Sequence, residues 1–137
     1  MLQRIQSIWL LLASACAIVS FKVPFYSGTN KEGIPSFKLV PDADHFVLML
    51  LTIVVAVLSL VCIFLYRNRT TQMRIVLLTM FVQIGLLAFY IKETMAFITG
   101  TYALTSILQV LILVFLFLAI RGINHDNKLI RDSDRLR

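Results

Sequence analysis

Four long apolar segments, each free of charged residues and histidine, limit what this chain can fold into. The segments are 17, 21, 17 and 18 residues long. About 20 apolar residues cross the hydrocarbon core of a bilayer, within a range of roughly 17–25. We therefore expect four membrane-spanning helices, over Ile5–Phe21, Phe46–Tyr66, Ile75–Ile91 and Ala103–Ile120.

The composition leaves no room for a separate soluble domain. The chain has 137 residues, of which 59% are hydrophobic and 15% are charged. Such a composition is too apolar for a soluble domain of this size. The predicted fold is all-α: a single four-helix membrane domain over residues 1–137, with an outer loop over residues 22–45 and a tail over residues 121–137.

The arginines predict how the four helices are oriented. When the segments are threaded through a membrane, all eight arginines fall on one side, whereas four lysines and four acidic residues cancel on the other. Cationic loops are retained in the cytoplasm, so both termini are expected to be cytoplasmic. The net charge of +6 then reflects topology and attraction to anionic headgroups, and no nucleic-acid partner is expected.

The first apolar segment has a second interpretation, as a signal peptide. Residues 12–16, ending at Cys16, loosely resemble a lipoprotein cleavage box. The apolar run continues past the cysteine to Phe21, where a mature lipoprotein normally becomes polar. We therefore favour an uncleaved first helix.

Small or polar residues recur at helical spacing on each segment, and they predict the seams of a compact bundle. Such residues let helices approach closely in lipid, where no hydrophobic effect drives association. The four stripes are Gln6, Ala13, Ala17 and Ser20; Thr52, Ala56 and Ser59; Thr79, Gln83 and Tyr90; and Tyr102, Thr105, Ser106 and Gln109. Gln83 and Gln109 lie at similar depth on adjacent antiparallel helices, so we expect an interhelical polar contact between them.

The connections carry two further expectations. In the 22–45 loop, apolar and aromatic stretches flank a turn over residues 28–33, which indicates a small β-hairpin over the bundle, although Pro24 and Pro35 weaken it. The tail over residues 121–137 could continue the fourth helix past Gly122 as a solvated or headgroup-bound helix. Asp126 and Arg131, or Asp132 and Arg135, could then form a local ion pair.

The residues that catalysis or cofactor binding needs are missing from the expected places. No ionisable group lies within the apolar segments, and neither a C-x-x-C pair, a nucleophile elbow nor a phosphate-binding loop is present. His45 and His125 fall on opposite sides, so they cannot hold one haem. Asp42, Asp44 and His45 are a weak signal for a cation. We expect no enzyme activity, no cofactor and no metal.

Both ends of the chain resemble a known family. The start, Gln3-Arg4-Ile5-Gln6-Ser7-Ile8, and the ending, Leu129-Ile130-Arg131-Asp132-Ser133-Asp134-Arg135-Leu136-Arg137, are similar to an uncharacterised four-helix integral membrane protein family of the Bacteroidetes, a domain of unknown function. The exit from the first helix, residues 21–25, fits that family loosely. The resemblance implies a multi-pass protein of the bacterial inner membrane, and it implies no catalytic residue.

The two family-like ends share the predicted cytoplasmic face. Arg4 could pair with Asp132 or Asp134 and tie the N-terminus to the tail, or both ends could form one surface for a partner. Exposed ion pairs contribute only about 0–1 kcal/mol, so stability alone gives little reason for this much charge. The leading hypothesis is an accessory or assembly subunit of a larger inner-membrane complex serving export, insertion or envelope maintenance. The alternative is a small homo-oligomeric transporter or channel, with Gln83, Gln109 and Thr105 near its path. The proposed partner-binding residues are Gln3, Arg4, Gln6, Arg131, Asp132, Asp134, Arg135 and Arg137.

Overall fold

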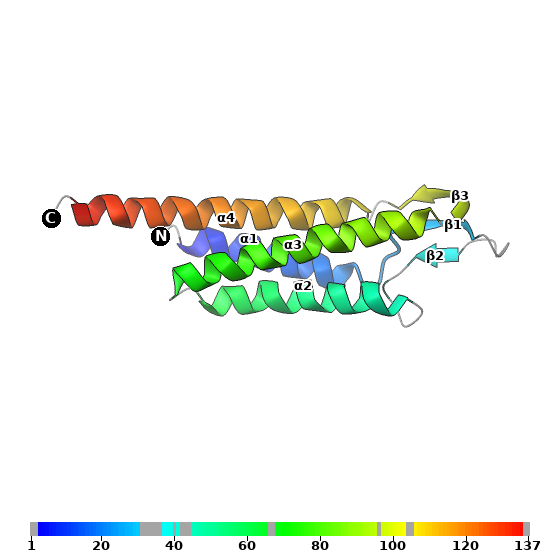
Figure 1. Ribbon diagram of the computed structural model, residues 1–137, viewed down its shortest axis with the longest axis horizontal. Coiled ribbons are helices and arrows are strands. Elements are labelled where there is room, and N and C mark those ends of the chain that lie inside the picture. The colour runs from blue at the N-terminus through cyan, green and yellow to red at the C-terminus, as the bar shows by residue number, and fades with distance from the viewer. Residues whose placement is uncertain are drawn as a thin grey trace.

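The computed structural model describes residues 3–30, 37–39, 41, 45–65, 68–95, 97–103 and 106–135, with only the backbone for residues 3, 4, 30, 37, 97 and 130–135. These residues form a four-helix bundle with a small sheet at one end (Figure 1). In chain order the elements are α1 (Gln3–Val19), β1 (Tyr26–Asn30), β2 (Phe37–Leu39), α2 (Phe46–Phe64), α3 (Arg69–Thr94), β3 (Phe97–Tyr102) and α4 (Ser106–Arg135).

The helices form a ring in which each one packs against two others. α1 contacts α2 and α4, and α3 contacts the same two helices. We call the end with the strands the sheet end, and the end where α1 begins and α4 finishes the terminal end (Figure 1). Because successive helices run in opposite directions, every neighbouring pair is antiparallel, as in an up-down-up-down bundle.

Buried positions recur at steps of three and four residues along each helix. This spacing keeps one narrow face toward the neighbouring helices, as in left-handed bundles. On α4 the buried residues are Gln109, Ile112, Leu116, Ala119, Ile123 and Asp126. Polar side chains therefore occupy the seams, and this agrees with the predicted stripes on α1, α2 and α3, all of whose members are buried.

The fourth stripe was predicted only in part. Gln109 is buried, but Tyr102 is 62% exposed, because it ends β3 instead of beginning a helix. α4 starts at Ser106, which is half-buried, and Thr105 is not among the described residues.

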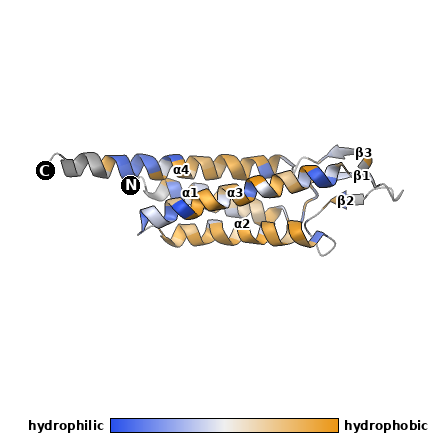
Figure 2. Ribbon diagram, in the orientation of Figure 1, coloured by the Kyte–Doolittle hydropathy of each residue, from blue (hydrophilic) through white to orange (hydrophobic). Residues whose placement is uncertain are grey.

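The surface of the bundle is apolar over most of its length. Large side chains such as Phe64 and Phe81 are about three-quarters exposed, at 76% and 74%. Figure 2 shows this hydrophobic band along α2, α3 and α4, with hydrophilic residues at the start of α3 and along the distal part of α4. Three helices, over Phe46–Phe64, Arg69–Thr94 and Ser106–Leu129, are long and apolar enough to cross a membrane, whereas α1 is a shorter apolar helix.

The strands form a three-stranded antiparallel sheet in the order β2-β1-β3. The pairing of β1 with β2 confirms the predicted hairpin, but Gly28, expected in its turn, lies inside β1 opposite Gly100 of β3. A Cβ atom on Gly28 would lie 2.2 Å from the Thr99 carbonyl oxygen, so this close approach requires glycine. β3 itself was not predicted.

The sheet is fixed to the bundle by a second, smaller core. Phe25 stacks on Tyr90 of α3 with ring centroids 4.4 Å apart, and the Tyr90 side chain is hydrogen-bonded to Thr52 of α2. The backbone N–H of Ala103, just after β3, donates to the Phe25 carbonyl at 3.0 Å. Phe25 therefore ties the sheet to α3 and to the connection before α4.

Candidate functional site

The terminal end of the bundle is where α4 extends past its neighbours (Figure 1). α4 has 30 residues, which at about 1.5 Å per residue is roughly 45 Å, well beyond a bilayer core of about 30 Å. The helix continues past Gly122, as the sequence suggested. Exposed Asn124, His125, Asn127 and Lys128 follow on its surface.

A buried hydrogen bond between α1 and α4 sets how far α4 projects. The Gln6 amide Nε2 donates to Asp126 Oδ2, and the two residues are 7% and 6% exposed. A Cβ atom on Gly122 would lie only 3.0 Å from Gln6 Cγ, so the glycine leaves room for this side chain. Since α1 begins at Gln3, only three residues before Gln6, residues of α4 beyond about 128 extend past the first turn of α1.

This contact corrects two expectations about individual residues. Gln6, predicted to bind a partner, is buried against α4 and donates to Asp126, so it positions the helices instead of facing solvent. Asp126, predicted to pair with Arg131 along the helix surface, turns inward toward α1. Its position was readable from the sequence, since Ile112, Leu116, Ala119 and Ile123 extend to Asp126 at steps of four and three.

The side chains of the other proposed partner-binding residues lie outside the described part of the chain. The described backbone places Gln3 and Arg4 in the first turn of α1, and Arg131, Asp132, Asp134 and Arg135 in the last turns of α4. Arg137 falls beyond the end of the described chain. Both helix ends lie at the terminal end of the bundle, as Figure 1 shows.

Gln83 and Gln109 form the predicted contact between α3 and α4, about one turn from the start of α4. Gln83 Nε2 donates to Gln109 Oε1 at 2.7 Å and approaches the Gln109 backbone oxygen at 3.2 Å. Both residues are almost fully buried, at 0% and 1% exposure. Within the part of the chain that the structure describes, buried Gln83 Oε1 accepts no hydrogen bond. The pair therefore links α3 to α4 and leaves one acceptor unused.

A third interhelical amide, Gln72, was not singled out from the sequence. Its Nε2 donates to the Cys62 carbonyl oxygen at 3.0 Å, near the end of α2. Gln72 thus joins α2 to α3 near the loop that connects them. The sequence feature that indicates a buried Gln72 is its spacing of seven residues from Thr79, which places both residues on the same buried face of α3.

The contacts of Gln6, Gln72, Gln83 and Gln109 are hydrogen bonds between helices. Among the described residues, no group of three or more His, Cys, Asp or Glu side chains is placed to hold a metal ion. Asp42 and Asp44 are not part of the described chain, so the weak cation signal near His45 is not tested. The thiols of Cys16 and Cys62 are free.

Comparison with known proteins gives one match. The model of a protein family described as a domain of unknown function (DUF4293) matches residues 2–136. Neither the curated proteins nor the solved structures include a match to this chain.

Proposed function

This chain belongs to the DUF4293 family, and from that premise we propose that it is a non-enzymatic accessory or assembly subunit of a larger complex in a bacterial inner membrane. The proposal includes four membrane spans with cytoplasmic termini, and an origin in the Bacteroidetes. Export, insertion and envelope maintenance are the processes in which such a subunit would act.

The observation that carries this proposal is the projection of α4 at the terminal end. Because Gln6 is level with Asp126, Gln3 is level with about residue 129, and the six residues over 130–135 add about 9 Å of helix beyond it. A helix without neighbours gains little from packing, so its persistence as a charged rod favours a role outside the bundle. The Gln6–Asp126 hydrogen bond supports the proposal, because it fixes the height and direction of this projection.

The proposed orientation has its own test. Lys128 on α4 and Lys38 on β2 are exposed and lie at opposite ends of the bundle, so each is replaced by cysteine in a separate variant. In intact cells freed of the outer membrane, a membrane-impermeant maleimide should label Lys38→Cys at once and Lys128→Cys only after permeabilisation. Cys16 and Cys62 are replaced by alanine in both variants. Labelling in the reverse order, or labelling of both before permeabilisation, contradicts the orientation.

The partner hypothesis is tested by removing the projection. A variant that ends at Asn127 keeps Asp126 and the contact with Gln6, so the bundle should remain folded. We expect a stoichiometric membrane-protein partner, recovered with the full chain after crosslinking in mild detergent, to be lost from this variant. Replacement of exposed Lys38 by glutamine is the matched control at the other end. An unchanged set of crosslinked proteins in the truncated variant rules out this surface.

The alternative function, a small homo-oligomeric transporter or channel, is favoured by one observation. Gln83 Oε1 is a buried acceptor without a donor among the described residues, as expected of a group that contacts a passing solute. Flux through proteoliposomes that disappears in the Gln83→Leu, Gln109→Leu variant supports transport. The hydrogen bond between these two residues favours the structural role, so the accessory subunit remains our proposal.

A further inference from the structure

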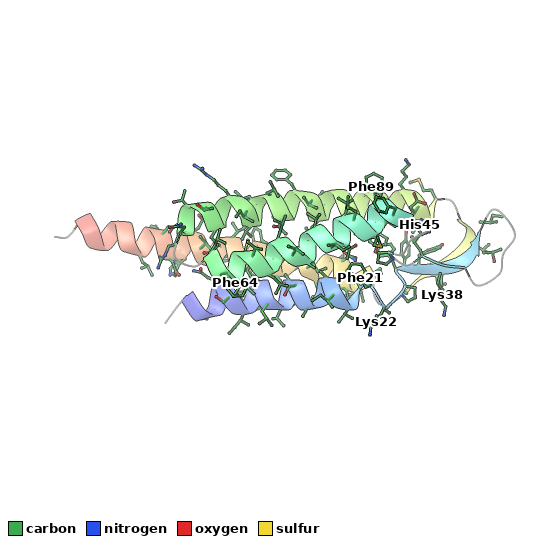
Figure 3. The ribbon with its side chains drawn as sticks, turned by 90° about the horizontal axis from the view of Figure 1, so that it is seen from below. Phe21, Lys22, Lys38, His45, Phe64 and Phe89 are labelled. Atoms are coloured by element: carbon green, nitrogen blue, oxygen red, sulfur yellow. The ribbon has the colours of Figure 1, made fainter. Side chains whose placement is uncertain are left out.

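A pocket of about 280 Å³ opens at the sheet end of the seam between α2 and α3. Four of its residues, His45, Phe46, Val47 and Leu48, begin α2, and the other two, Phe89 and Glu93, come from the last turns of α3. Figure 3 shows His45 and Phe89 at this end of the bundle, at the opposite end of α2 from Phe64. The volume is just below the usual range of small-molecule sites, about 300–1,000 Å³, so it suits a small group better than a whole lipid.

The pocket combines an apolar wall with charged groups at one rim. Phe46 and Phe89 are 62% and 40% exposed and face outward from the bundle. Glu93 supplies a carboxylate that is half-buried. The Lys92 ammonium lies 6.0 Å from the centroid of the Phe89 ring, which places a cation beside the same pocket. An anion and a cation therefore flank one hydrophobic surface.

The backbone adds the same pattern of charge. α2 begins in this pocket, so the partial positive charge of its first-turn N–H groups lies beside the pocket. α3 ends beside it with partial negative charge and Glu93. Opposite charges at the rim of one apolar surface match a zwitterion better than a simple anion or a simple cation.

We propose that this pocket binds the phosphoethanolamine headgroup of a membrane phospholipid. The Glu93 carboxylate accepts hydrogen bonds from the primary ammonium, while Lys92 and the first-turn N–H groups of α2 face the phosphate. Phe46, Val47 and Phe89 contact the glycerol and the upper acyl chains. A choline headgroup lacks N–H donors for Glu93, and a glycerol headgroup lacks the positive charge. The proposal rests on the membrane placement given above and is independent of the partner surface.

The test compares three phospholipids with the same acyl chains. Purified full-length protein, stripped of lipid in mild detergent, is titrated with phosphatidylethanolamine, phosphatidylcholine or phosphatidylglycerol while thermal unfolding is followed. We expect phosphatidylethanolamine to raise the unfolding midpoint most. Glu93→Gln should weaken its apparent affinity by about tenfold, because the acceptor of the ammonium hydrogen bond loses its negative charge. Lys38→Gln, at an exposed position on β2, should leave the affinity unchanged.

Two further measurements keep the inference testable if Glu93→Gln folds poorly. A photoactivatable phosphatidylethanolamine should crosslink the unmodified protein at residues 46–48 or 89, as read by mass spectrometry. Soluble glycerophosphoethanolamine, which has no acyl chains, should not compete at lipid concentrations, and equal competition would assign the site to a free metabolite instead. Equal stabilisation by all three lipids, a preference for phosphatidylcholine, or crosslinks elsewhere overturns the proposal. The variant that ends at Asn127 should keep this lipid preference, so the two proposals fail separately.

Discussion

The hydrogen bond between Gln6 and Asp126 should be the strongest single polar link between the first and last helices. Replacing either residue by leucine leaves its partner buried without a hydrogen bond. Gln6→Leu should cost more free energy of unfolding than Asp126→Leu, because a buried carboxylate without a donor is more costly than a buried amide. The variant with both leucines leaves neither polar group behind.

The size of the coupling follows from the chemistry of the bond. Hydrogen bonds to charged groups contribute about 1.5–3 kcal/mol net, so the double variant should lose about 1.5–3 kcal/mol less than the sum of the single variants. Asp126→Asn retains an acceptor for Gln6 and should lose far less than Asp126→Leu. Gly122→Ala adds a Cβ atom 3.0 Å from Gln6 Cγ, so the alanine should stabilise the helix only when Gln6 is also shortened to alanine.

The measurement is reversible unfolding of each variant in mixed micelles with increasing dodecyl sulfate, followed by circular dichroism. Free energies are compared at a common detergent composition. Single-variant losses that add to within about 0.5 kcal/mol would show that Gln6 and Asp126 are not coupled. A loss in Asp126→Asn equal to that in Asp126→Leu would show that the charge, and not the hydrogen bond to Gln6, stabilises the bundle.

Further predictions concern the sheet and the contact between α3 and α4. Gly28→Ala should break the pairing of β1 with β3 and expose the sheet end to added protease, because the new Cβ would lie 2.2 Å from a backbone oxygen. Gly85→Ala, which lies in a helix with open space around it, should instead stabilise the protein by up to about 1 kcal/mol. Equal behaviour of the two variants would contradict the packing described for Gly28. A double-mutant cycle of Gln83→Leu and Gln109→Leu should give a coupling of about 0.6 kcal/mol and at most about 1.7 kcal/mol; a much larger value would point to an additional partner of Gln83 Oε1.

Much of the bundle could be predicted because lipid and helix geometry constrain it strongly. Uncharged segments of sufficient length located the helices, and stripes of small and polar residues located their seams. The contact between Gln83 and Gln109 followed from depth alone, since both amides had to avoid hydrocarbon and only the neighbouring helix was in reach. These inferences needed no knowledge of distant contacts.

Features that depend on distant contacts were harder to foresee. β3 follows α3 directly, and its pairing with β1 joins segments about 70 residues apart, so no local pattern distinguishes β3 from a loop. Phe97, Ile98 and Tyr102 are residue types common in strands, but they form a strand only because β1 pairs with them. The charge of Asp126 predicts an exposed residue, because charged side chains are usually exposed. The spacing of the buried residues along α4 predicts instead that Asp126 is buried, and this prediction is correct.

The ring of helices has a consequence for how the protein is made. α1 packs against α2 and α4, and the contact with α4 includes the Gln6–Asp126 hydrogen bond. α4 leaves the ribosome after α1, α2 and α3, so a nascent chain that holds only these three helices has an open side along α1 and α3. Until α4 has been made, the amide of Gln6 has no Asp126 to donate to and must be satisfied by water or by lipid headgroups. The ring of helices closes when α4 packs against α1 and α3.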